Sequence, residues 1–349
     1  MEDRLREFGY EIQCLIRKKD LSRNETKEMF SRILFNQYPD FQQGAFLAAL
    51  ASKGETCEEI AGCWEAIYEL DTAKVSPEIA QPLVENCGTG MDELKTFNIS
   101  TASSIIAAAN GIYLAKHGAR AITSRCGAVD ILERLGINVD CGVEVVKKSI
   151  ENCGIGLFNG TSPKIHPKLE RILSQIRFGS IINIVASLAN PAFPQYGVRG
   201  VYSKDKVRLV AEVMKEIGYK RALVVCGFDS KDEMCMDELS TLGKNFVCEL
   251  SKNGKINCYE FYPEDIGLDR GKYEEIYPEE INKETKNFIR LISGNLKNSR
   301  YEIVCLNAAA IFYIMNKVKD LKEGVNVAKE VIESGRAIEK LIQWKECQR

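Results

Sequence analysis

The first ~70 residues carry apolar side chains at helical spacing. The first set recurs every three or four positions and consists of Leu5, Phe8, Ile12, Leu15 and Ile16. Ser22 followed by Glu25, and Thr56 followed by Glu59, each have the spacing of a capping box and predict two further helix starts. A helix over 41–50, ended by Gly54, lies between them. The pattern predicts a compact unit of four helices.

Beyond Leu83 short apolar runs alternate with amphipathic segments. The runs predict strands over 112–116, 155–158, 200–202 and 221–226, and the segments between them predict helices over 129–135, 143–152 and 204–217. Two more runs, 246–250 and 256–261, flank Asn253-Gly254, which is typical of a hairpin turn. Helices over 286–293, 303–317 and 325–341 follow. Strands that alternate with helices favour an α/β sheet covered by helices.

The two patterns meet where proline interrupts helical periodicity. Pro77 and Pro82 fall in the segment 71–82, which places the domain boundary there. We therefore predict an α/β protein with a small N-terminal all-helical domain, residues 1–75, and a larger α/β domain, residues 76–349.

Composition narrows the function classes. The 349 residues are 45% apolar and 28% charged, with a net charge of −2, so no basic surface for nucleic acid is expected. No apolar run approaches the ~18 residues of a membrane span, and the start lacks the pattern of a signal peptide. The expectation is a cytoplasmic protein without a membrane partner.

Cysteine is abundant and histidine is scarce. The chain has 13 cysteines but no Cys-x-x-Cys pair, so a zinc or iron–sulfur site is poorly supported. In a reducing compartment disulfides are not expected, and most of these thiols should be buried apolar side chains. The two histidines, His117 and His166, leave little for a histidine-based catalytic triad.

The stretch 85–101, "ENCGTGMDELKTFNIST", combines glycines with hydroxyl and amide groups directly before an apolar helical run. Glycines let backbone N–H groups approach an anion, and a helix N-terminus adds partial positive charge at the same point. The stretch lacks the Gly-x-Gly-x-x-Gly string of a dinucleotide fold and the Gly-Lys-Ser/Thr ending of a Walker loop. A phosphate site is one interpretation, and a plain loop with a helix cap is the other.

Two further segments carry candidate chemistry. In "AKHGAR", 115–120, Lys116 lies at the carboxyl end of a predicted strand, which is where ligands bind in open α/β sheets. In "MDELSTLG", 236–243, the adjacent acids Asp237 and Glu238 suit Mg²⁺, although a solvated acidic loop would look the same.

Taken together, these segments make the chain resemble anthranilate phosphoribosyltransferase along nearly its whole length. The resemblance is carried by "KGETCEEIAG" (53–62), "CGTGMDELKTFNISTASS" (87–104), "AKHGAR" (115–120), "DILERLGIN" (130–138), "RALVVCGFD" (221–229), "DELSTLG" (237–243), "PEDIGL" (263–268), "LNAAA" (306–310) and "EGVNVAKEVIESGRAIEKL" (323–341). It implies a nucleoside phosphorylase-like fold with a mostly parallel central sheet. It also implies that part of 164–180 joins the helical domain, that the chain is a homodimer through that domain, and that phosphoribosyl diphosphate (PRPP) and Mg²⁺ bind in the cleft.

The resemblance assigns three groups of site residues. PRPP would be bound by Gly88, Thr89, Gly90, Asp92, Thr96, Asn98, Ser100, Thr101, Lys116 and Cys126. Mg²⁺ would be held by Ser100, Asp237 and Glu238. A small aromatic acceptor would lie among His117, Ala119, His166, Ile176, Arg177, Ala186 and Ser187.

The chain departs from the family pattern mostly in the acceptor group. Ala119 replaces a family asparagine, and Ile176 falls at or beside the family's carboxylate-binding arginine, where Arg177 is a candidate substitute. Met91 replaces a glycine, and Cys126 and Ala128 replace serines. The favoured hypothesis is a Mg²⁺-dependent phosphoribosyltransferase with a changed acceptor. The alternatives are a true anthranilate phosphoribosyltransferase of tryptophan biosynthesis, a nucleoside phosphorylase-like enzyme and a non-catalytic PRPP-binding protein.

Overall fold

The computed structural model describes residues 2–120, 126–176 and 178–349. It begins with four helices: α1 (Glu2–Ile16), α2 (Arg23–Leu34), α3 (Asp40–Lys53) and α4 (Cys57–Leu70). Both predicted capping boxes form, with the Ser22 side chain accepting from the Glu25 N–H and the Thr56 side chain accepting from the Glu59 N–H. Local sequence signals therefore set the starts of α2 and α4.

The apolar stripes of these helices face inward. Phe8, Leu15 and Ile33 are fully buried in one cluster with residues of the α/β domain. The cluster extends to apolar residues of 169–188 and 207–226, so these stripes are buried with the help of the α/β domain. The exposed apolar side chains of this region are instead Tyr10, Ile16, Phe35 and Phe41.

A mixed sheet forms the centre of the molecule. Its strands are β1 (Leu83–Gly88), β2 (Tyr113–Gly118), β3 (Ile155–Asn159), β4 (Tyr196–Gly200), β5 (Arg221–Phe228), β6 (Cys235–Met236), β7 (Asn245–Leu250) and β8 (Ile256–Phe261). The order is β3-β2-β1-β4-β5-β7-β8, and β6 pairs with β5. The first five strands in this order are parallel, and the pairs that involve β6, β7 and β8 are antiparallel. The predicted fold class, a small helical domain plus an α/β domain with a mostly parallel sheet, is confirmed.

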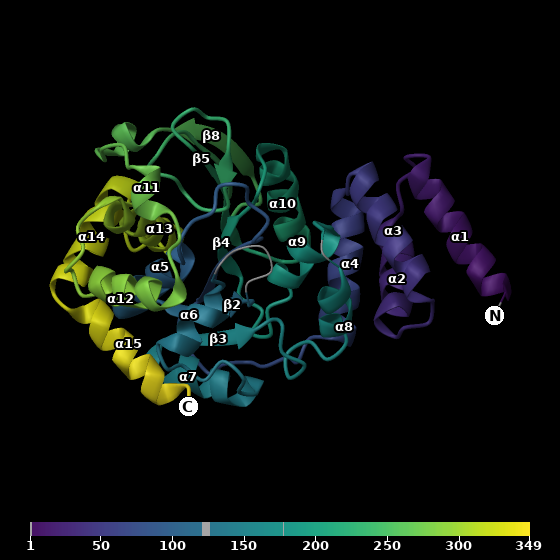
Figure 1. Cartoon of the computed structure of the whole chain (residues 1–349), viewed down its shortest axis with the longest axis horizontal. Coiled ribbons are helices and arrows are strands. Elements are labelled where there is room, and N and C mark those ends of the chain that lie inside the picture. The colour runs from purple at the N-terminus through teal and green to yellow at the C-terminus, as the bar shows by residue number, and fades with distance from the viewer. Residues whose placement is uncertain (1, 121–125, 177) are drawn as a thin grey trace.

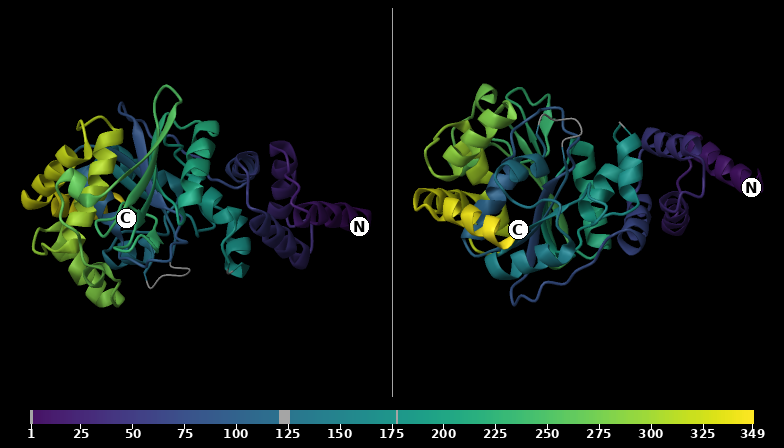
Figure 2. Two further views of the ribbon diagram at one scale, coloured as in Figure 1. Left: turned by 90° about the horizontal axis from the view of Figure 1, so that it is seen from above. Right: turned by 60° about the horizontal axis from the view of Figure 1, so that its bottom comes forward.

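Helices cover both faces of the sheet (Figures 1 and 2). On one face lie α5 (Ile99–Ala109), α13 (Ser299–Ile314), α14 (Leu321–Glu333) and α15 (Arg336–Cys347). On the other lie α9 (Ile181–Leu188) and α10 (Lys204–Glu216), which join the sheet to the helical domain. The remaining elements are α6 (Ala128–Arg134), α7 (Val143–Cys153), α8 (Leu169–Gln175), the 3₁₀ turn η1 (Pro263–Ile266), α11 (Tyr273–Ile276) and α12 (Ile281–Ile292).

Helices α8 and α9 lie against the N-terminal helices although they are far away in sequence (Figure 1). Arg171 on α8 donates to Asp40 and to the Ile33 carbonyl, at 3.0 and 2.9 Å. Trp64 on α4 donates to the Leu188 carbonyl at 3.1 Å. These contacts agree with the expected association of 164–180 with the helical domain, while the boundary at 75/76 remains a prediction.

Three local predictions need correction. The strand expected at 200–202 is β4, Tyr196–Gly200. The single helix expected over 325–341 is two helices, because Gly335 adopts a left-handed conformation with φ 80° between them. No disulfides were expected, but Cys248 and Cys258 form one. The hairpin places these residues directly opposite each other with Cα atoms 4.1 Å apart. None of the described helices is long and apolar enough to cross a membrane.

Candidate active site

A cavity of about 210 Å³ lies at the carboxyl ends of β1 and β2. The N-terminus of α5 and the loop after β6 line one end of it, and residues of α8 and α9 line the other. Parallel strands bring these chain-distant segments together because their carboxyl ends share one edge of the sheet. We call the first the phosphate end, defined by Gly88–Gly90, Asn98, Ser100, Lys116 and the Asp237–Glu238 pair. The second is the acceptor end, defined by His117, Ala119, Thr161, Leu173, Asn183 and Ala186–Ser187.

Glycines at the phosphate end allow close approach of an acid. The Gly90 N–H donates to Asp237 Oδ2 at 2.6 Å, and Gly90 itself adopts φ 71°. A Cβ on Gly88 would lie 2.3 Å from Asp237 Oδ2, and one on Gly200 would lie 1.4 Å from the Asp237 carbonyl oxygen. The backbone contact excludes any side chain at Gly200, and a side chain at Gly88 would displace the Asp237 carboxylate, so both glycines hold the acidic loop close to the turn.

Three carboxylates cluster at the phosphate end. One oxygen each from Asp92, Asp237 and Glu238 lies within 4.8 Å of the others. Burial and the Asp237 charge raise the pKa of Asp92 to about 8, and burial together with the same charge raises the pKa of Glu238 well above its usual range. Glu238 Oε2 is buried and has no hydrogen-bond partner among the described residues. A cluster of hard oxygen donors with one orphaned carboxylate oxygen fits Mg²⁺.

Lys116 and the start of α5 complete this end. The Lys116 ammonium is buried and donates to Ser100 Oγ and to the Asn86 carbonyl, both at 3.2 Å. Burial lowers the pKa of this lysine. Asn98, the N-cap residue of α5, donates from Nδ2 to the Cys126 carbonyl at 3.3 Å, which leaves its Oδ1 buried and unpaired among the described residues. Backbone N–H groups of a helix start beside a lysine form a site for an anion.

The acceptor end has few charged groups. Ala119, Leu173 and Ala186 present aliphatic side chains to the cavity, beside the amide of Asn183. Met91 reaches across from the phosphate end, and a Cβ on Gly179 would lie 2.4 Å from its Cε. The described residues at this end would bind a ligand through its shape and through hydrogen bonds, with few charged groups.

A buried histidine pair lies under this end. The rings of His117 and His166 have centroids 5.4 Å apart, and both residues are almost fully buried. His117 hydrogen-bonds the backbone of Ser187, which leaves Nε2 without a partner among the described residues. Burial lowers the pKa of His117 well below its usual range and that of His166 to about 4. Both imidazoles are therefore neutral near pH 7.

The predicted site residues divide into two groups. The residues that line the cavity are Gly88, Thr89, Gly90, Asp92, Thr96, Asn98, Ser100, Lys116, His117, Ala119, Cys126, Ala186, Ser187, Asp237 and Glu238. The described lining does not include Thr101, His166 or Ile176. Thr101 is buried in α5, His166 lies next to His117, and Ile176 packs against the core shared with the helical domain. Arg177 lies outside the described residues.

Sequence reasoning did not assign several lining residues to the site. Arg120 follows a predicted strand end and could have been found on that signal, whereas nothing local marks Thr161, Leu173 or Asn183. Leu173, one helical turn before Ile176, occupies the position at the cavity that we had expected Ile176 to fill.

Known proteins are similar to this chain in both sequence and fold. Residues 80–338 match the family described as "Glycosyl transferase family, a/b domain", and residues 11–70 match its helical bundle domain. The anthranilate phosphoribosyltransferase of Desulfosudis oleivorans is 36% identical over 340 residues, which cover 96% of this chain and 97% of that one. This chain belongs to the anthranilate phosphoribosyltransferase family.

Solved structures of the family agree with this assignment. The chain superposes on the anthranilate phosphoribosyltransferase of Thermus thermophilus with a TM-score of 0.87 and 31% identity, covering 97% of this chain and 99% of that one. The Saccharomyces cerevisiae enzyme, solved in complex with PRPP and Mg, has a TM-score of 0.80 at 22% identity, covers 94% of this chain and 93% of that one, and shows the shared fold. The family resemblance expected from the motifs is confirmed.

Proposed function

We propose that this protein transfers the phosphoribosyl group of PRPP to anthranilate in a Mg²⁺-dependent reaction that releases diphosphate. The relatives named above support anthranilate as the acceptor. The sequence favours a changed acceptor, with anthranilate as its first alternative. The observation that carries the proposal is the carboxylate cluster facing a glycine turn, a helix start and a buried lysine in one cavity. In the yeast relative the same combination of ligands, PRPP and Mg, is present.

Each group at the phosphate end has a role in this reaction. The start of α5 and Lys116 would bind the diphosphate through N–H donors, and the Gly88–Gly90 turn would lie beside it with the Gly90 N–H holding Asp237. Ser100, Asp237, Glu238 and Asp92 would hold Mg²⁺. When bound, the metal supplies positive charge against the departing diphosphate.

The acceptor end would orient the attacking amine. Transfer breaks the bond between ribose C1 and the diphosphate oxygen and forms a bond from C1 to the acceptor nitrogen, which then loses a proton to solvent. His117 Nε2 is buried against Gly160, so the lining residues around it would orient the amine. Holding donor and acceptor in line accounts for most of the catalysis expected here, because no strong base is required.

A second candidate acceptor is a small aromatic amine without a carboxylate. Aliphatic lining by Ala119, Leu173 and Ala186 favours it, since a carboxylate buried there would need a cationic partner. Steady-state assays with PRPP, Mg²⁺ and either anthranilate or aniline separate the two candidates. Turnover of anthranilate with stoichiometric diphosphate supports the first. Turnover of aniline alone supports the second, and phosphorolysis of nucleosides would contradict both.

We also propose that the enzyme works in the cytoplasm as a homodimer joined through α1–α3. Phe41 is 95% exposed, and Tyr10, Ile16 and Phe35 are each more than half exposed. Several large apolar side chains on one small helical unit are typical of an interface.

A further inference from the structure

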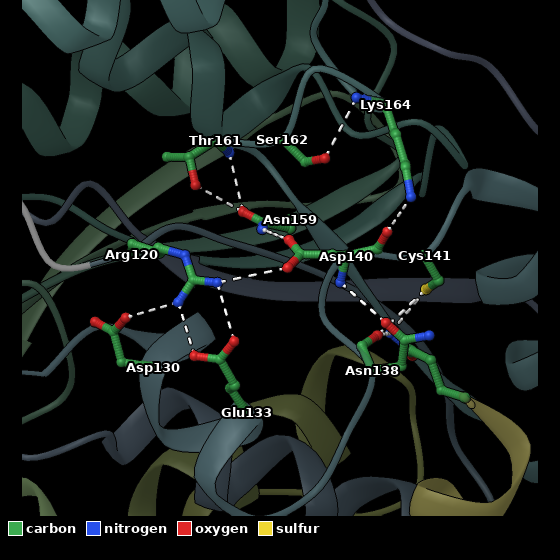
Figure 3. A network of polar contacts seen from close by, with 11 residues as sticks. Arg120, Asp130, Glu133, Asn138, Asp140, Cys141, Asn159, Thr161, Ser162 and Lys164 are labelled. Atoms are coloured by element: carbon green, nitrogen blue, oxygen red, sulfur yellow. Dashed lines mark hydrogen bonds and ion pairs between the residues drawn. The ribbon is translucent and has the colours of Figure 1, made fainter.

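Arg120 is a charged residue of the cavity lining that belongs to an extended polar network. It follows β2, lines the cavity, and contacts three carboxylates (Figure 3). Its Nη1 lies 3.3 Å from Asp130 Oδ1 and 2.9 Å from Glu133 Oε2, and its Nη2 lies 3.2 Å from Glu133 Oε1 and 3.7 Å from Asp140 Oδ2. The hydrogen bonds to Glu133 raise the pKa of this guanidinium further, so it stays charged.

One arm of this network leads to the phosphate end. Asp130 accepts from the Gly127 N–H at 2.8 Å through its other oxygen, in the first turn of α6. The neighbouring Cys126 carbonyl accepts from Asn98, the residue that begins α5. Cys126, Gly127 and Asn98 all line the cavity. Arg120 is thus connected to the predicted PRPP site through Asp130.

The other arm leads to the acceptor end. Asp140 Oδ1 accepts from Asn159 Nδ2 at 3.3 Å, and Asn159 Oδ1 accepts from the N–H and the hydroxyl of Thr161 at 3.1 and 2.7 Å. Lys164 donates to the Asp140 carbonyl at 2.6 Å and holds the same loop from outside (Figure 3). Thr161 lines the cavity, as does Gly160, where a Cβ would lie 2.8 Å from His117 Nε2.

We propose that Arg120 is a positioning residue that fixes the acceptor end relative to the phosphate end. The inference rests on the proposed function, because that function assigns donor and acceptor to the two ends. Single exposed ion pairs contribute little. A planar guanidinium that directs its N–H groups at three carboxylates restrains them in direction as well as distance, which a lysine cannot do. Small misplacements of reacting groups are costly in rate.

Four variants separate the arms. Arg120→Gln should raise both the Kd of PRPP and the KM of anthranilate, each ~10-fold, and Arg120→Lys should recover little of this loss. Asp140→Asn should raise the KM of anthranilate ~5-fold with the Kd of PRPP within about twofold of wild type, and Asp130→Asn should do the reverse. Glu133→Gln is the matched control: it touches the same guanidinium, belongs to neither arm, and should leave both values within about twofold.

The decisive measurement needs no acceptor. Hydrogen–deuterium exchange of residues 159–164 is followed with and without PRPP and Mg²⁺. In wild type and Glu133→Gln, PRPP should slow exchange in this loop, whereas in Arg120→Gln and Asp140→Asn it should not, although PRPP still binds. Because the Asp140 side chain is 64% exposed, that variant should fold even if Arg120→Gln does not.

The outcomes are distinct. Wild-type protein that does not bind PRPP by calorimetry would overturn the proposed function and this inference together. PRPP binding without anthranilate turnover would overturn only the proposed acceptor, and the exchange measurement would still decide the role of Arg120. PRPP binding with no slowing at 159–164, slowing that survives Arg120→Gln, or full rescue by Arg120→Lys would each show that Arg120 is an ordinary surface ion pair.

Discussion

The two ends of the cavity differ in the charge of their polar groups. The phosphate end has the acids Asp237 and Glu238 and the Lys116 ammonium, which donates to Ser100. The acceptor end has the neutral imidazole of His117 and the amide of Asn183 beside aliphatic side chains. The phosphate end is preorganised around fixed donors and acids. The acceptor end is defined mainly by shape, which makes it the part that can change its ligand at least structural cost.

The largest expected effect tests the acids of the phosphate end. Asp237→Ala combined with Glu238→Ala should weaken PRPP binding in Mg²⁺ by about a hundredfold or more, since a metal clamp on phosphate oxygens contributes several kcal/mol. Calorimetry of PRPP with Mg²⁺ and with chelator measures this. Glu233→Gln, an exposed acid just before β6, is the control. If neither chelator nor the double substitution changes the affinity for PRPP, the assignment of a metal to this end is wrong.

The second prediction concerns the histidine pair below the acceptor end. Burial lowers the pKa of His166 from 6.5 to about 4. As pH falls below 6.5, His166 becomes protonated in the unfolded chain but stays neutral in the folded protein. The free energy of unfolding should therefore fall by roughly 3 kcal/mol between pH 6.5 and 4. Above pH 6.5 this contribution is constant.

Urea unfolding at several pH values measures this slope. His166→Gln should flatten the slope, and the remainder reports His117, whose pKa is also lowered by burial. An unchanged slope in the variant would mean that His166 titrates normally and that the acceptor end is wetter than its burial indicates.

The third prediction exchanges single side chains at the two ends. Ala119→Asn restores the amide that the family pattern carries and should raise kcat/KM for anthranilate about tenfold, with PRPP binding unchanged. Ala128→Ser, at the phosphate end, is the counterpart and should strengthen PRPP binding without changing the KM of anthranilate. A change in PRPP binding in Ala119→Asn, or in the KM of anthranilate in Ala128→Ser, would show that the two ends are not independent. Wild-type turnover at micromolar anthranilate that Ala119→Asn fails to improve would show that the original pocket is intact.

The smallest effect on the cavity is expected from the helical domain. Phe41→Asp should convert a dimer to monomer in light scattering at micromolar concentration, because a charge replaces a side chain that is 95% exposed in the isolated chain. PRPP affinity should stay within about twofold, since α3 is remote from the phosphate end. Lys19→Asp, a charge change at an exposed position outside α1–α3, is the control. A wild-type monomer would refute the dimer.

The correct predictions rest mostly on local signals. The Ser22 and Thr56 capping boxes, the Asn253-Gly254 hairpin and the alternation of strands with helices all lie within a few residues of the structure they specify. The glycine turn at 88–90 and the acids at 237–238 were identified as separate candidates because each has its own composition. Such signals also sufficed for the family resemblance.

Distances between segments remote in sequence were decided only by the tertiary structure. The sequence contains Gly88 and Asp237, but the order β1-β4-β5, with β6 paired to β5, is what brings one against the other. It contains Leu173 and Ile176, but the placement of α8 against the cavity decided that Leu173 lines it and Ile176 does not. Cys248 and Cys258 join because the hairpin register sets them opposite. Local propensity fixes which elements form. Close packing at the carboxyl edge of the sheet decides which side chains are in contact there, because segments distant in sequence meet at that edge.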